Sequence, residues 1–106
     1  MRNSYEPKPR LSPINYLLLV SDVTGIRSVD ILAKNKKKEV VEARQICMFF
    51  YKQKIGIYWA GLTLNKSHST VSHGYNTVQG LLEVEDKRTL DFVLQIKNLE
   101  ENGKLT

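Results

Sequence analysis

The sequence predicts an all-α domain, a bundle of five to six helices that contains a helix-turn-helix with a basic loop upstream of it. Apolar residues recur mostly at spacings of three and four, which indicates helices packed on one core. Alternating apolar and polar runs are scarce, and no hairpin dipeptide joins two of them, which argues against a β-rich fold. The length of 106 residues suits a single domain with a core of its own.

The first expected helix spans residues 13–24. Pro13 is typical of a first helical turn, Ser12 suits the N-cap, and Gly25 ends the helix. Residues 1–12 contain two prolines and few apolar side chains, so we expect them to form a flexible tail. The apolar stripe that we expect to face the core consists of Ile14, Leu17, Leu18 and Val23.

A short second helix is expected from Val29 to Lys34, with Ser28 as its N-cap. The basic loop follows at residues 34–38, which read Lys-Asn-Lys-Lys-Lys without an apolar anchor. A third helix is expected from about Val40 to Lys54, and Gly56 breaks it. Its broad apolar face consists of Ala43, Ile46, Cys47, Phe49 and Phe50.

The helix-turn-helix is expected within residues 57–82. Residues 57–64 form a short apolar helix, residues 65–66 form a tight turn, and Ser67 opens a longer helix through residue 82. The long helix begins with four residues that carry short polar side chains, Ser67, His68, Ser69 and Thr70. Free N–H groups at such a helix start attract phosphate, and short side chains there can reach base edges in a major groove.

The final helix is expected to begin at Glu85 or Asp86 and to complete a domain over residues 13–102. Residues 103–106 are expected to fray. The side chains that this helix turns toward the core are expected to be Leu90, Val93, Leu94 and Leu99.

The positive charge is concentrated in the middle of the chain. The formal net charge is +5, yet residues 27–68 alone hold nine basic and three acidic side chains. Residues 69–106 hold four basic and six acidic ones. A basic stretch around a helix-turn-helix is the charge pattern of a nucleic-acid binder, although a solvated lysine face would give the same count.

Several other classes of protein are disfavoured. A single cysteine, Cys47, excludes an internal disulfide framework and a cysteine-rich zinc site, and its apolar surroundings predict a core position. The longest apolar run, residues 16–20, is too short to cross a bilayer, and no signal peptide is found. No constellation indicates catalysis, and no phosphate-binding loop indicates an ATPase. We expect a cytoplasmic, nucleoid-associated protein that is not an enzyme and that has no cofactor, bound metal or membrane contact.

Residues 66–74 read Lys66-Ser67-His68-Ser69-Thr70-Val71-Ser72-His73-Gly74. This run is similar to the signature of the C-terminal DNA-binding domain of the bacterial replication initiator DnaA, which ends in Arg-Asp-His-Thr-Thr-Val. The family belongs to the Trp-repressor-like group of helix-turn-helix folds. Upstream, the order of a helix, Val29-Asp30-Ile31-Leu32, a basic loop and Arg44-Gln45 also matches. The resemblance covers roughly residues 13–85 and does not include the family's ATPase domain.

The resemblance implies that the chain binds double-stranded DNA, with roles carried over position by position. It implies base contacts from Lys66, Ser67, His68 and Ser69, and from Lys36 in a neighbouring minor groove. It implies phosphate contacts from Thr70, Arg44, Gln45, Lys52, Lys37, Lys38 and His73. A domain of this kind without the ATPase suits an accessory or regulatory protein in replication or transcription, a monomer or weak dimer with possible partners in the replication machinery.

Two other functions stay open at this stage. The chain could be an adaptor that binds a protein and competes with the initiator, using the apolar region around Trp59 and the acidic C-terminal helix. It could also bind structured RNA through the same basic region. Binding of random duplex DNA at two salt concentrations distinguishes these alternatives.

Overall fold

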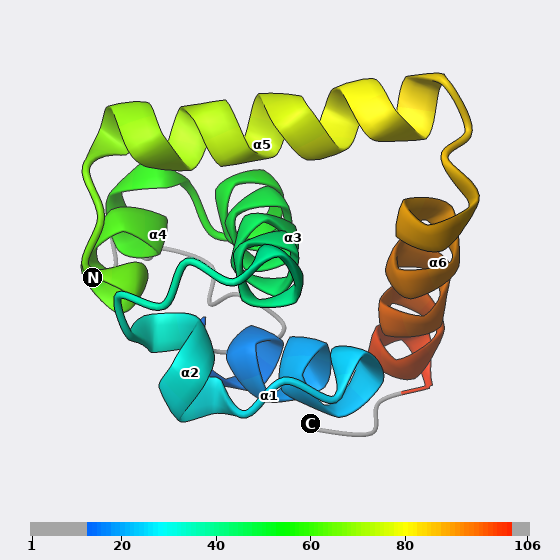
Figure 1. The fold of residues 1–106 in the computed structure, drawn as a ribbon, viewed down its shortest axis with the longest axis horizontal. Coiled ribbons are helices and arrows are strands. Elements are labelled where there is room, and N and C mark those ends of the chain that lie inside the picture. The colour runs from blue at the N-terminus through cyan, green and yellow to red at the C-terminus, as the bar shows by residue number, and fades with distance from the viewer. Residues whose placement is uncertain (1–12, 103–106) are drawn as a thin grey trace, which may run out of the picture.

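The computed structural model describes residues 13–102, which form six helices joined by short connections (Figure 1). No strand occurs in this part of the chain, so the predicted all-α class is confirmed. The helices are α1 (Pro13–Thr24), α2 (Ser28–Leu32), α3 (Lys38–Lys54), α4 (Ile57–Leu64), α5 (His68–Glu83) and α6 (Lys87–Glu101).

The central element is α3, which the other helices surround (Figure 1). It contacts α1, α2, α4 and α5, and every side chain from Ile46 to Tyr51 is buried. A helix with neighbours on several sides is apolar nearly all round, which is why the predicted face of α3 is so broad. All five residues predicted for that face are buried.

Aromatic rings join α1 to α3. The ring of Tyr16 stacks on Phe50 at a centroid distance of 5.9 Å and meets the ring of Tyr51 edge to face at 5.8 Å. Such pairs add geometric specificity to the burial of large apolar surfaces. Cys47 is buried in the same core, as predicted, and burial raises the pKa of its thiol, so the side chain acts as a small apolar group.

Glycine lets α5 lie close to α3. A Cβ added at Gly74 would overlap Sδ of Met48 and would lie 3.2 Å from Cβ of the same residue. The two helices also share a ring stack, in which Phe49 and Tyr75 lie 5.3 Å apart. The close approach holds α5 firmly against the centre of the core.

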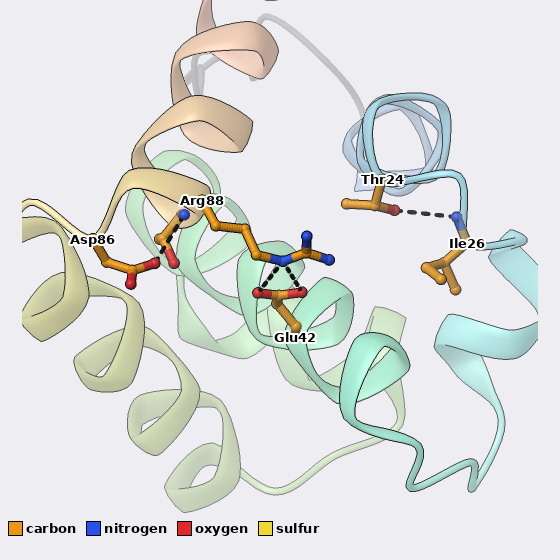
Figure 2. Close-up of polar contacts among 6 residues, drawn as sticks. Thr24, Ile26, Glu42, Asp86 and Arg88 are labelled. Carbon is orange, nitrogen blue, oxygen red and sulfur yellow. Dashed lines mark hydrogen bonds and ion pairs between the residues drawn. The ribbon is translucent and has the colours of Figure 1, made fainter.

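Polar contacts attach α6 at both of its ends. Asp86 accepts a hydrogen bond from the backbone N–H of Thr89 at 3.1 Å, and this bond lowers the pKa of the Asp86 carboxyl. Nε of Arg88 donates to both carboxylate oxygens of Glu42 on α3 at 3.0 Å (Figure 2). At the far end of α6, Glu100 is buried and accepts a hydrogen bond from the hydroxyl of Tyr16.

Two residues predicted to lie in the core are exposed instead. Leu18 on α1 is 46% exposed, because α1 turns its other side toward the core and buries Tyr16, Leu17, Leu19 and Val20. Leu94 on α6 is 55% exposed, because α6 turns Val93 and Ile96 inward. Spacing identifies an apolar stripe, but the rotation of the helix against its neighbours decides which edge of the stripe is covered.

The predicted helix ends are correct where glycine or a capping side chain sets them. Gly25 and Gly56 follow α1 and α3 with positive φ angles of 79° and 111°, and Ser67 caps α5. The N-cap of α2 is Arg27 rather than Ser28, with no side-chain bond, and α2 ends at Leu32. The predicted N-cap Ser12, the tail at residues 1–12 and the end at 103–106 lie outside the described residues.

Candidate nucleic-acid interface

The helix-turn-helix consists of α4, a turn and α5. After α4, Asn65 adopts a left-handed conformation with φ 56° and ψ 50°, and the N–H of Lys66 donates to the carbonyl of Gly61 at 3.0 Å. Ser67 then caps α5, because its Oγ accepts a hydrogen bond from the N–H of Thr70 at 3.2 Å. The predicted turn and N-cap are thus present at the predicted residues.

The turn brings the start of α5 very close to the backbone of α4. A Cβ added at Gly61 would lie 2.9 Å from the carbonyl oxygen of Lys66 and 3.3 Å from Cδ2 of His68. The imidazole of His68 therefore lies against Gly61 of α4, where the glycine hydrogen fits and a Cβ does not. This contact sets the position of His68 relative to the rest of the helix-turn-helix.

Asparagine at residue 65 is expected to matter for stability. A left-handed φ angle raises the energy of residues that carry a Cβ. The cost is small for asparagine and absent for glycine. We expect Asn65→Ala to lower the free energy of unfolding by about 1 kcal/mol, and Asn65→Gly to leave it within about 0.5 kcal/mol of the parent. Urea unfolding followed by circular dichroism measures both. Equal stability of the alanine and glycine variants would contradict the assigned conformation.

The start of α5 presents an uncharged polar surface. Ser67, His68, Ser69 and Thr70 are all exposed, and His73 is exposed one turn further along. Of these side chains, that of His68 contacts α4 and still remains exposed. The first turn of α5 also leaves backbone N–H groups directed outward, which favours an anion at this end.

The basic loop between α2 and α3 is exposed as well. Lys36 and Lys37 are solvent-facing, and Oδ1 of Asn35 accepts a hydrogen bond from the N–H of Lys37 at 2.9 Å. Lys38 is also exposed, but it is the first residue of α3 and not part of the loop as predicted. Lys38 lines a hollow with Leu81 and Arg88, near the C-terminal end of α5 and away from His68.

The structure places Arg44 differently from the other basic residues of this region. It is only 7% exposed, and its Nε donates to the carbonyl oxygen of Ile31 at 2.7 Å. Its Nη2 donates to the carbonyl oxygens of Ala33 at 2.8 Å and Asn35 at 2.9 Å. The guanidinium that we expected to contact phosphate is therefore turned into the domain.

Lys52 is half-buried and lies against α5. Its Nζ is 4.2 Å from the ring centroid of Tyr75, which is a cation–π contact. The contact holds the ammonium beside the middle of α5. Gln45 is half-buried on the same helix, α3. Tyr75 was not identified from the sequence as a partner of Lys52, because the two lie on different helices.

A shallow hollow of about 430 Å³ lies where α4 meets α5. Its lining brings together Tyr58 and Leu62 of α4 with Lys66, Ser67 and His68 of the turn and α5. Three of the predicted base-contacting residues, Lys66, Ser67 and His68, thus share one surface. Lys36 is in the separate loop between α2 and α3 and does not line this hollow.

The comparison with known protein families concerns this same region. Residues 17–78 match the family described as the bacterial DnaA protein helix-turn-helix. The match includes α2, α3 and α4, the basic loop, and α5 as far as Val78. The chain belongs to the bacterial DnaA helix-turn-helix family.

Proteins named chromosomal replication initiator protein DnaA are similar to this chain over much of its length. The one from Pseudothermotoga lettingae is 32% identical over 101 residues, which are 93% of this chain and 22% of that protein. The one from Bacteroides thetaiotaomicron is 42% identical over 73 residues, 62% of this chain and 14% of that protein. The chain therefore spans about a fifth or less of the length of these DnaA relatives.

One part of this DnaA-family domain that the sequence offered as a protein-binding surface, the apolar region around Trp59, is exposed. Tyr58, Trp59 and Leu62 on α4 are each more than half exposed, and the rings of Tyr58 and Trp59 meet edge to face at 5.2 Å. Their apolar spacing alone predicts a buried face. The helix α4 is short and lies at one end of the long axis of the domain, and no other helix within residues 13–102 covers its outer side (Figure 1).

Two other kinds of feature are not found within residues 13–102. No group of three or more His, Cys, Asp or Glu side chains comes together there in a way that could hold a metal ion. No helix in that range is long and apolar enough to cross a lipid bilayer.

Proposed function

We propose that this DnaA-family domain binds double-stranded DNA in a sequence-directed manner. The observation that carries the proposal is the exposed start of α5, Ser67 to Thr70, presented by a helix-turn-helix. A recognition helix of this kind enters a major groove with its first residues on the base edges. The family membership supports the same function, because the matched relatives are named as replication initiators.

The proposed roles are carried over position by position from the resemblance to the DnaA family. Ser67, His68, Ser69 and Lys66 meet base edges in the major groove, and Lys36 enters a neighbouring minor groove, where narrow A·T tracts attract cations. The residues proposed to contact phosphates are Thr70, Gln45, Lys52, Lys37, Lys38 and His73. Arg44 is left out of this set because its side chain is buried.

We place this activity in the cytoplasm, at the nucleoid, and infer an accessory or regulatory role in replication or transcription. The domain acts by binding and not by catalysis, as a monomer or weak dimer. Proteins of the replication machinery are its proposed partners besides DNA. The family membership supports the proposed place in the cytoplasm and in replication, because the matched relatives are named as replication initiators.

The two classes of contact predict different mutant behaviour. We expect His68→Ala and Ser69→Ala to lower discrimination between a selected site and random duplex by about 1–3 kcal/mol each. We expect Lys37→Ala and Lys52→Ala to weaken binding to both duplexes about equally and to reduce the salt slope by about one. Fluorescence anisotropy with a duplex selected from a random pool, at two or more salt concentrations, measures both effects.

Lys97→Ala is the matched control for the lysine variants, because Lys97 is exposed on α6 and away from the proposed interface. It should bind like the parent protein. If base-reading and phosphate variants behaved alike on selected and random duplexes, the assignment of roles would be wrong. If the parent protein bound RNA hairpins better than any duplex, the proposed DNA-binding function itself would be wrong.

A second candidate function is supported by the exposed apolar surface of α4, formed by Tyr58, Trp59 and Leu62. Exposed aromatic and leucine side chains in one place are typical of protein-binding surfaces. An adaptor that uses this surface would bind its partner without duplex DNA and with little dependence on salt. Trp59→Ala should then abolish partner binding while leaving duplex affinity unchanged.

A further inference from the structure

The side chain of Arg44 contacts the segment that joins α2 to α3. Its Nε and Nη2 donate three hydrogen bonds of 2.7 to 2.9 Å, to the carbonyl oxygens of Ile31, Ala33 and Asn35. A longer contact of 3.4 Å joins Nη2 to the carbonyl oxygen of Asp30. One guanidinium thus holds four carbonyls between residues 30 and 35.

These carbonyls belong to a helix end and a loop. At the end of α2, the N–H of Ala33 donates to the carbonyl oxygen of Asp30 at 3.2 Å. Ala33 is in an extended conformation, so no glycine cap completes the end of the helix. Arg44 supplies donors to the carbonyls of Ile31, Ala33 and Asn35, and a positive charge is favourable at the C-terminal end of a helix.

The loop is held from inside while its lysines face outward. Lys34, Lys36 and Lys37 are all exposed, and the bond from the Lys37 N–H to Asn35 continues the ordered backbone to the N-cap of α3. The carbonyl of Asn35 is the last that Arg44 holds, and it directly precedes Lys36. The position of Lys36 is therefore tied to the Arg44 side chain by one residue of backbone.

We propose that Arg44 is a positioning residue, which fixes the basic loop so that Lys36 and Lys37 meet an anionic groove in a defined place. It acts through the loop and does not itself contact a phosphate. This inference rests on the proposed DNA-binding function. The planar fork of arginine is essential to the role, because a lysine ammonium at the same place is a point donor that cannot span carbonyls on both sides of Ala33.

The first test uses the domain without DNA. A lysine-specific endoprotease has four sites in the segment 34–38, and Arg44→Gln leaves them unchanged. We expect Arg44→Gln to increase the cleavage rate in this segment about tenfold or more, with little change at Lys52, Lys54 and Lys66, because the loop opens locally. Mass spectrometry of early fragments identifies each cut.

Arg27→Gln is the matched control for this measurement. Arg27 precedes α2 and carries the same charge, but its side chain is 77% exposed and pairs with the carboxylate of Asp30. The Arg27→Gln variant should be cleaved in the segment 34–38 at the same rate as the parent protein. Cleavage of Arg44→Gln at the parent rate, or equal acceleration at every lysine of the domain, would overturn the proposal.

The second test separates positioning from phosphate contact. We expect both variants, Arg44→Lys and Arg44→Gln, to lose selectivity. The ratio of affinities for the selected and the random duplex should fall by about fivefold to tenfold in each. The salt slope on random duplex should stay unchanged in both, because no phosphate contact is removed. If Arg44 contacted a phosphate instead, the result would depend on the charge of the new residue. Arg44→Gln would then reduce the salt slope by about one, and Arg44→Lys would not.

The two tests fail independently. If the parent protein binds no duplex, the proposed DNA-binding function fails, and the protease measurement still reports whether Arg44 holds the loop. If the parent binds duplex but the slope falls only in Arg44→Gln, the DNA-binding function stands and the positioning role is overturned.

Discussion

Replacing Gly74 by valine is expected to lower the free energy of unfolding by about 3 kcal/mol. A Cβ at this position would overlap Sδ of Met48 and would press on its Cβ, which cannot move without moving α3. Because α3 is the central helix and packs more extensively on α5 than on any other helix, overpacking here disturbs the main helix pair of the domain. Urea unfolding followed by circular dichroism measures the loss.

Gly80→Val is the matched control for this substitution. Gly80 lies on α5 as well, and a Cβ there meets no atom within 4 Å, so the free energy of unfolding should stay within about 0.5 kcal/mol of the parent. Met48→Ala opens space for the new side chain. The double variant Met48→Ala/Gly74→Val should therefore lose less free energy of unfolding than the two single variants lose together. The difference, which is the coupling energy, should be about 1 kcal/mol or more. Strict additivity would show that the clash is not with Met48.

Replacing Gly61 by valine is expected to remove most of the site selectivity of DNA binding. The added Cβ would lie 2.9 Å from the Lys66 carbonyl oxygen and 3.3 Å from the His68 ring, so the turn and the imidazole must both move. Displacing a base-reading side chain should cost about 1–3 kcal/mol of discrimination, besides a loss of about 1–3 kcal/mol in stability. Binding to random duplex, which depends on the lysines, should fall much less.

Thr63→Val is the control on the same helix, because Thr63 does not line the hollow that contains Lys66 and His68, and valine is nearly the same size as threonine. Binding is compared at a temperature where circular dichroism shows both variants to be folded. Gly61→Val should then lose selectivity and Thr63→Val should keep it. Parent-like selectivity in folded Gly61→Val would show that the contact between α4 and His68 does not place the base-reading surface.

The helix ends and the helix-turn-helix could be predicted because their causes are local. Gly25 and Gly56 occupy positive φ angles just after helices, and Ser67 accepts a bond from a residue three positions away. Such contacts depend on neighbours in the chain, so the pattern of residues is sufficient to predict them. The broad face of α3 was also predictable, since a helix that is apolar nearly all round has few places other than the centre.

The orientation of individual side chains could not be predicted in the same way. Leu18 and Leu94 belong to apolar stripes but lie outside the covered part of them. Lys52 lies over Tyr75, which is on another helix and 23 positions away. The spacing of apolar residues predicts which face of a helix is apolar, but it does not predict which neighbouring helix covers that face.

Arg44 shows most clearly where the sequence stops and the tertiary structure begins. By itself, the sequence determined an all-α chain with a polar helix start at Ser67 and a concentration of lysines upstream, because caps, breakers and charge are properties of neighbouring residues. Only the tertiary structure decided that Arg44 turns inward, because the carbonyls that attract it lie nine to fourteen residues away and come together only when α2 packs on α3. The basic residues of this region thus have two different places. The loop lysines are exposed, and Arg44 is buried beneath them against the loop backbone.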